Sequence, residues 1–249
     1  QKRIARTGKV VKSYGEHPQE IHRMRLSPCE RYIAASGVIW KTNDKFNIRI
    51  WSVKTGKPIE LEIIRKQPIM GFEFSPNGDR VLVASRDGLV GWHQVADGKP
   101  IGQPLSLKTK VFALAYHAET DTVALGGTDR QIRFVSSKTW KHRAPTVACD
   151  GAILALKFCK NGKLLMSGGQ DRTARMWHVP TGEQVGIKRR FDLECHCVAV
   201  SRDGTRMLAG GDDGTVIFWT TPTASAVGPQ ELARLVKDAA GGDPDDEHP

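Results

Sequence analysis

The feature that most constrains this chain is a motif that recurs at one constant interval along the sequence. In one copy, Met166 to Glu183, small residues lead to an aspartate turn, an alternating strand follows, and Pro-Thr-Gly closes the motif. Three positions keep the same spacing from copy to copy: the turn aspartate (Asp87, Asp129, Asp171, Asp213), the strand end (Trp51, His93, Val135, Trp177, Trp219) and the closing turn (Thr55, Asp97, Thr139, Thr181, Thr223). Self-similarity at one fixed period, the interval that separates Asp87 from Asp129, predicts a repeat architecture.

The first copy of the motif is longer than the others. The interval from Ser27-Pro28 to Ser75-Pro76 equals the interval from Thr7-Gly8 to Thr55-Gly56, and both exceed the period that separates Asp87 from Asp129. The excess is six residues in each case, so a single six-residue insertion within 38–47 accounts for both intervals.

Each repeat has the pattern of four short strands. Pairs such as Phe72/Phe74 and Leu156/Phe158 alternate with other residues at period two, which indicates a half-buried strand. Asn77-Gly78 and Asn161-Gly162 follow these strands, and such dipeptides favour hairpins because they tolerate positive φ. A second strand, the strand after the Asp turn and a weaker fourth strand complete the unit. Four strands per roughly 40–45 residues are typical of one blade of a β-propeller.

The chain resembles the WD-repeat family over about residues 1–221. The resemblance is carried by Phe-Ser-Pro-Asn-Gly-Asp at 74–79, by the Gly-Gly-x-Asp turns, and by the strands Ile48–Trp51, Ala174–Trp177 and Val216–Trp219. It implies an all-β WD-repeat β-propeller with five recognisable four-stranded blades. The family often has a histidine before the first strand that bonds to the turn aspartate. Here only His17 fits, and the matching positions hold Arg65, Leu107, Cys149 and Phe191, so we expect greater reliance on apolar packing.

The repeat register predicts where the blades begin and end. We expect the outer strand of a preceding blade at 1–13, and a short helix with an acidic tail at 222–249. The five blades are placed at 14–61, 62–104, 105–146, 147–188 and 189–221.

Two arrangements of the blades stay open. The strand Lys9–Val11 could complete the last blade and close a five-bladed ring. Alternatively, the chain is part of a seven-bladed or larger array with further blades upstream, which we favour because WD-repeat rings usually have seven blades. The segment Pro229–Val236 resembles the C-terminal tail of bacterial multi-repeat WD proteins, many of which carry a Ser/Thr kinase domain upstream.

Several chemistries are disfavoured by the residues present. There is no Gly-x-Ser-x-Gly elbow, no phosphate-binding Gly-Lys-Ser/Thr loop and no kinase signature, so we expect no enzyme and no cofactor. The four periodic aspartates repeat in every blade after the first, which favours a structural role in fixing the turn through backbone N–H bonds. Cys195-His196-Cys197 invites a metal site, but both cysteines align with inward positions of a first strand, so packed thiols and no metal are expected.

Five cysteines, an odd number, do not indicate a disulfide framework, and we expect a reducing cytoplasm. The longest apolar runs are too short to span a bilayer, so no membrane partner is expected.

The most informative remaining feature is charge. The net charge is +10, and residues 228–249 hold six acidic and two basic side chains, a net of −4, so the rest of the chain carries +14. WD-repeat partners often bind the face built from the loop before the first strand and the Asp loop. On that face we place a candidate binding set: Trp40, Lys41, Lys45, Phe46, Arg65, Lys66, Arg86, Lys108, Lys110, Arg130, Arg172, Lys188, Arg189 and Arg190. Asp150, Asp192, Glu194 and Asp212 dilute this charge without reversing it.

These observations favour a non-catalytic scaffold that binds an acidic protein partner and serves as the docking or sensory module of a larger bacterial signalling protein. The acidic tail Asp243–Glu247 could occupy the basic face in cis. The first alternative is nucleic-acid binding through the same face, against which stand few loop aromatics and no nucleic-acid motif. A propeller enzyme is the second alternative.

Overall fold

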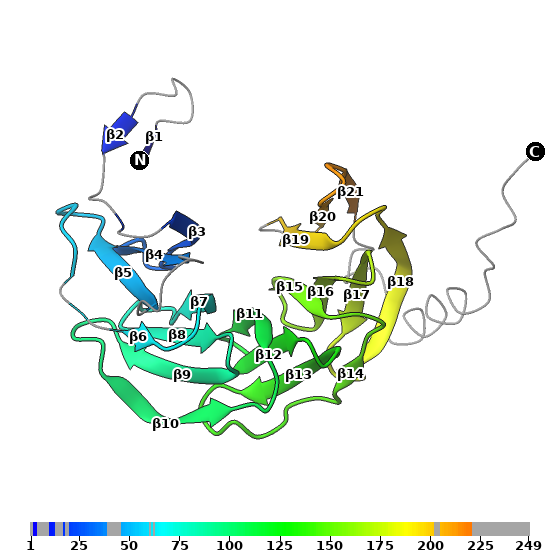
Figure 1. The fold of residues 1–249 in the computed structure, drawn as a ribbon, viewed down its shortest axis with the longest axis horizontal. Helices are drawn as coiled ribbons and strands as arrows, with labels where there is room; N and C mark the ends of the chain where they lie inside the picture. The colour runs from blue at the N-terminus through cyan, green and yellow to red at the C-terminus, as the bar shows by residue number, and fades with distance from the viewer. Residues whose placement is uncertain are drawn as a thin grey trace, which may run out of the picture. The chain divides into compact units, whose positions relative to one another are not determined.

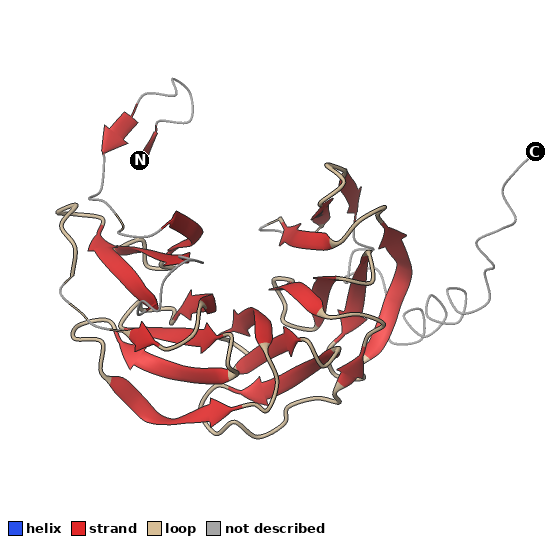
Figure 2. Cartoon of the chain, in the orientation of Figure 1, coloured by secondary structure: helices blue, strands red, loops and turns tan. Residues whose placement is uncertain are grey.

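The computed structural model describes residues 2–3, 10–12, 17, 20–38, 46–59, 61, 63–201 and 205–220. Every regular element in these residues is a β-strand, joined to the next by turns and loops (Figure 2). Within the same residues, no helix has the length and apolarity needed to cross a membrane. The all-β prediction is confirmed. The short helix and acidic tail expected at 222–249 lie outside the described residues.

The chain divides into two compact units, residues 1–111 and 112–249. The first unit contains a two-stranded sheet (β1-β2) and two four-stranded antiparallel sheets, β3 to β6 and β7 to β10, each in sequential order (Figure 1). Its strands are β1 (Lys2–Arg3), β2 (Val10–Lys12), β3 (Glu20–Leu26), β4 (Tyr32–Val38), β5 (Phe46–Ser52), β6 (Ile64–Arg65), β7 (Ile69–Phe74), β8 (Arg80–Ser85), β9 (Leu89–Gln94) and β10 (Pro100–Ser106).

The second unit contains three sheets of the same design, β11 to β14, β15 to β18, and β19 to β21, the last with three described strands. Its strands are β11 (Val111–His117), β12 (Thr122–Gly127), β13 (Gln131–Ser136), β14 (Val147–Ala148), β15 (Ile153–Phe158), β16 (Leu164–Gly169), β17 (Thr173–His178), β18 (Glu183–Arg190), β19 (Cys195–Val200), β20 (Arg206–Gly211) and β21 (Val216–Thr220).

The cores of both units lie between neighbouring sheets. In the first unit, Ile48 and Ile50 of β5 pack with Phe72 and Phe74 of β7. In the second unit, β13 and β15 contribute to one cluster, and β16, β17 and β20 contribute to another. Full burial of one such side chain stabilises the fold by about 1.5–3 kcal/mol, so each of these clusters contributes to the stability of its unit.

The fourth strands differ most from the sequence prediction. Among the described residues, the weaker fourth strand of the first repeat consists of a bridge between Trp51 and Pro58 and of the paired residues of β6 at 64–65. The other fourth strands end at Ser106, Ala148 and Arg190, beyond the predicted blade ends at 104, 146 and 188. Of these fourth strands, β10 and β18 are largely exposed, so they lack the apolar alternation by which a strand is predicted from sequence.

Candidate interaction surface

The turn aspartates share one hydrogen-bond geometry. In each of the four, Oδ1 accepts the backbone N–H of the residue two positions later, at 3.3 Å for Asp87, 3.4 Å for Asp129, 3.1 Å for Asp171 and 2.8 Å for Asp213. This Asx-type turn closes the loop between the second and third strands and leaves that loop's other backbone groups for the neighbouring loops.

In the first unit, the loops next to these turns lie together along one edge of the sheet β7 to β10, the edge formed by the ends of its strands. The backbone N–H of Arg86 donates to the Pro68 carbonyl at 2.8 Å, and Leu107 N–H donates to the Gly88 carbonyl at 3.0 Å. Because these bonds join the loops at 66–68, 86–88 and 107–110, the predicted residues Lys66, Arg86, Lys108 and Lys110 come from adjoining loops. All three lysines are exposed, and Arg86 is half-buried. We name these four residues the basic edge.

Arg65 does not belong to this edge. It lies in β6, half-buried, and its guanidinium contacts His93 Nε2 at 2.8 Å. His93 Nδ1 lies 2.9 Å from the Gly98 carbonyl, an arrangement that fits a neutral ring with the proton on Nδ1. Burial and the nearby Arg65 charge lower the pKa of His93. Both residues line a small hollow between β9 and β10. Sequence reasoning missed this pair, although Arg65 and His93 stand at the family's histidine and tryptophan positions.

In the second unit, the predicted basic residues are mixed with acidic ones. Arg130 and Arg172 are exposed, each in a turn with positive φ, and the Arg172 guanidinium donates to the Asp192 carbonyl at 3.4 Å. Lys188, Arg189 and Arg190 lie in strand β18 rather than in a loop, which corrects their predicted placement. The reason is that β18 continues past Gly186. Glycine interrupts a strand pattern in the sequence, but Gly186, with a φ of +67°, is accommodated within the strand.

The predicted aromatic anchor Phe46 is also corrected. It is the first residue of β5, is only 8% exposed, and belongs to the core of the first unit. Its side chain is therefore unable to anchor a partner. Trp40, Lys41 and Lys45 lie outside the described residues.

A buried ion pair stabilises the Asp turn of the sheet β15 to β18. Arg175 is 10% exposed, and its guanidinium binds Asp171 Oδ2 at 2.7 Å, Thr173 Oγ1 at 3.0 Å and the outer carboxylate of Asp150. The sheet β11 to β14 repeats the pair one period earlier, with Arg133 and Asp129 at 2.5 Å and more exposed. The two repeats share an Asp-x-x-x-Arg spacing, and this sequence signal could have predicted the ion pair.

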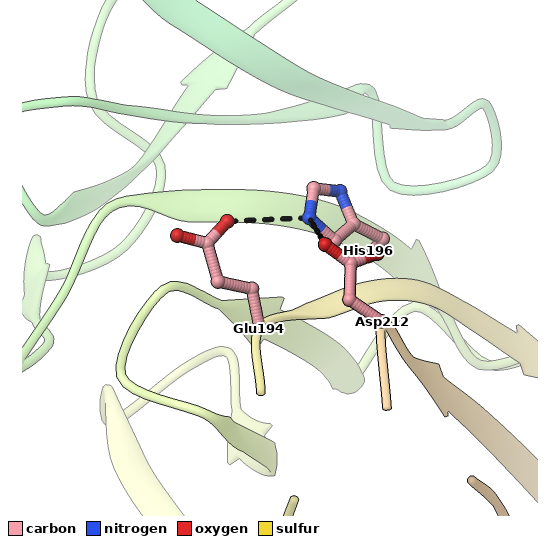
Figure 3. A group of neighbouring side chains, drawn as sticks. All are labelled: Glu194, His196 and Asp212. Atoms are coloured by element: carbon pink, nitrogen blue, oxygen red, sulfur yellow. Dashed lines mark hydrogen bonds and ion pairs between the residues drawn. The ribbon is translucent and has the colours of Figure 1, made fainter. Parts of the chain in front are cut away.

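A second charged cluster is formed by His196 of β19, Glu194 just before that strand and Asp212 just after β20. His196 Nε2 lies 3.2 Å from Glu194 Oε2 and 3.1 Å from Asp212 Oδ2, so both carboxylates reach the same ring nitrogen (Figure 3). Gln170 donates to the other oxygen of Glu194 at 3.1 Å. Imidazole and carboxylate are ligand types that zinc accepts. Contacts among these three side chains already account for their positions, and the absence of a metal stays a prediction.

The five cysteines are free thiols with different environments. Burial raises the pKa of Cys195 and Cys149 to about 12 and that of Cys159 to about 11. The expectation that Cys197 is packed inward is wrong: Cys197 is exposed, whereas Cys195 in the same strand is fully buried.

Cys29 is expected to be alkylated faster than the buried thiols. Burial acts to raise its pKa, but hydrogen bonds with Ser27 and Arg31, both at 3.4 Å, outweigh it and lower the pKa. A lower pKa gives more thiolate near neutral pH, and the thiolate is the reactive species. Iodoacetamide labelling read by peptide mass spectrometry across pH 6–9 should show the Cys29 rate rising at lower pH than that of Cys149. Equal pH profiles for the two thiols would contradict this prediction.

Successive four-stranded antiparallel sheets, each with its strands in chain order, have the design of the blades of a β-propeller. Two repeats, residues 142–178 and 188–220, match the family model described as WD domain, G-beta repeat. Residues 142–178 and 188–220 are therefore WD repeats, and the sheets of the chain have the blade design of a WD-repeat β-propeller. Propellers of this type generally act as protein-interaction scaffolds and are typically non-catalytic.

Solved structures agree on the fold. Of 1673 matching chains, one is the crystal structure of the computationally designed Ika8 protein, with a TM-score of 0.68 and 20% identity. The match covers 87% of this chain and 63% of that chain, so this chain spans less than two thirds of the designed protein. The comparison with curated proteins gives no match.

Proposed function

We propose that this chain is a non-catalytic scaffold that binds an acidic protein segment on the basic edge. The observation that carries this proposal is the joining of three loops by backbone hydrogen bonds, which brings Lys66, Arg86, Lys108 and Lys110 onto one edge. In these loops, all of whose residues the structure describes, the only acidic side chain is Asp87, which accepts a bond from Ser85 at 2.6 Å and one from a backbone N–H. Like charges gathered in this way attract an oppositely charged partner and accelerate its encounter.

The second unit supports the proposal less well. Its loops carry the exposed carboxylates of Asp150 and Asp212, which are 70% and 57% exposed, beside Arg130 and Arg172. Opposite charges interleaved on one surface cancel beyond a Debye length of about 8 Å. We therefore assign the docking site for the acidic partner to the first unit and not to the second.

The wider setting is part of the same proposal. A cytoplasmic location, a bacterial source and a place in a signalling protein are supported by the free cysteines and by the resemblance of Pro229–Val236 to bacterial multi-repeat WD proteins. The acidic partner would then be a segment of another signalling component.

Charge reversal at the basic edge is expected to weaken acidic-peptide binding about fivefold or more at low salt. The change is Lys66→Glu, Lys108→Glu and Lys110→Glu together, and the probe is a fluorescein-labelled peptide of ten glutamates followed by anisotropy. The matched control reverses three exposed lysines at the opposite strand ends, Lys54, Lys57 and Lys99. Because both variants change the net charge equally, a specific site predicts a loss in the first variant alone.

Equal losses in the two variants would contradict a localised site, since only net charge would then matter. A single-stranded oligonucleotide of 20 thymidines tests the nucleic-acid alternative in the same assay. Tighter binding of the oligonucleotide than of the peptide, with a steep loss of affinity as salt rises, would favour that alternative.

A further inference from the structure

Two sheets each expose an apolar face. On the sheet β19 to β21, Leu208, Val216 and Phe218 are 42%, 70% and 57% exposed. On β3, the first strand of the sheet β3 to β6, Ile21, Met24 and Leu26 are 46%, 53% and 55% exposed. Clusters of large exposed apolar side chains of this kind mark interaction surfaces.

The residues equivalent to Leu208, Val216 and Phe218 are buried in other sheets. One period earlier they are Met166, Ala174 and Met176, none more than 7% exposed, which pack with residues of β19 and β20. Two periods earlier, Ala124, Ile132 and Phe134 are fully buried against β15. In the first unit, Ala34, Ile48 and Ile50 are buried against β7. This face of a sheet is thus the one that contacts the following sheet.

The residues equivalent to Ile21, Met24 and Leu26 form the opposite side of the same interfaces. They are Ile69, Phe72 and Phe74 in β7, and Ile153, Leu156 and Phe158 in β15, all at most 8% exposed. Each trio belongs to the core cluster between its sheet and the preceding one. This face of a sheet is thus the one that contacts the preceding sheet.

Strand alternation keeps both exposed faces directed away from their own units. In β20, Met207 and Ala209 pack toward β15 to β18, so Leu208 between them points outward. In β3, Arg25 pairs with Glu73 of β7 at 3.1 Å, so Met24 and Leu26 point to the other side.

We propose that copies of this chain associate head to tail, with the Leu208/Val216/Phe218 face of one copy packed on the Ile21/Met24/Leu26 face of the next. The argument rests on continuity, because three sheet-to-sheet interfaces inside the units use these same two sets of positions. Each copy therefore carries both halves of an interface that it already forms internally. Such a contact is heterologous, so it generates a closed ring or an open filament rather than a two-fold dimer.

Light scattering coupled to size-exclusion chromatography tests this proposal on the full 249-residue chain. We expect a mass above that of one chain that increases between 1 and 100 µM. Phe218→Lys and Met24→Glu, as separate variants, are each expected to weaken association about tenfold or more, because each puts a charge into an apolar interface. Ile187→Lys is the control, since Ile187 is 73% exposed on β18 and belongs to neither face.

Mixing the two variants distinguishes this geometry from other modes of association. In a head-to-tail assembly, the lysine introduced on one face meets the glutamate introduced on the other, and the two unchanged faces meet each other. The mixture is therefore expected to recover the larger mass. A monomeric mass for the unmodified chain at 100 µM would overturn the proposal. Failure of the mixture to recover would also overturn it, provided that circular dichroism shows both variants folded.

Discussion

Replacement of Gly88 by alanine is expected to lower the free energy of unfolding by about 2–4 kcal/mol. Gly88 follows the turn aspartate Asp87 and has a φ of +88°, a conformation that costs an L-residue about 1–2 kcal/mol. A Cβ atom there would lie 2.3 Å from the Leu107 carbonyl oxygen and 2.6 Å from that of Thr109. These atoms belong to the backbone of the loop that carries the basic edge, so relieving the clash requires that loop to move.

Gly214 provides the matched control for this substitution. It holds the same repeat position with a φ of +79°, and a Cβ atom there meets no heavy atom of the described residues within 4 Å. Gly214→Ala therefore incurs only the backbone term, about 1–2 kcal/mol. Urea unfolding followed by circular dichroism compares the two. Similar losses would show that backbone conformation alone explains glycine here, and that the loop at 107–109 adapts.

Replacement of Arg175 by leucine is expected to cost about 3 kcal/mol of stability. The substitution leaves the carboxylate of Asp171, only 10% exposed, without its guanidinium partner. The corresponding change in the preceding repeat, Arg133→Leu, is expected to cost about 1 kcal/mol or less, because Arg133 and Asp129 are 22% and 24% exposed and water can solvate the remaining charge. Thermal or urea unfolding of both variants measures the difference.

A double variant identifies the cause of the Arg175 effect. If the uncompensated charge is responsible, Arg175→Leu combined with Asp171→Asn should recover a good part of the lost stability, since asparagine still accepts the Thr173 N–H. A double variant no more stable than Arg175→Leu alone would instead assign the loss to packing around the guanidinium.

The fold could be predicted because its signals repeat. One constant spacing fixes the aspartate turns and the paired strands, and each further copy strengthens the same assignment. The fourth strands were less well predicted because edge strands are exposed on both faces and carry little apolar alternation. Phe46 was misplaced for a related reason, since the six-residue insertion obscures where β5 begins.

The candidate surface could be predicted only in part. Local sequence identifies which side chains are charged, but it does not show which neighbours neutralise them. Arg65 turns toward His93, and Asp150 lies against Arg175, because contacts between residues far apart in the sequence decide these partners. The loops of the basic edge are joined by backbone hydrogen bonds, which do not depend on side-chain identity, and the binding role of their charged residues stays a prediction.

The packing of sheets against sheets also determines where opening begins in the second unit. Within the described residues of a single copy, the sheet β15 to β18 has packed neighbours on two sides, whereas β19 to β21 packs on one. In such a linear array, stability is close to a sum of intrinsic and nearest-neighbour terms. Losing β19 to β21 therefore breaks one interface, whereas losing β15 to β18 breaks two. We expect partial unfolding of this unit to start at β19 to β21, and refolding to start from β15 to β18.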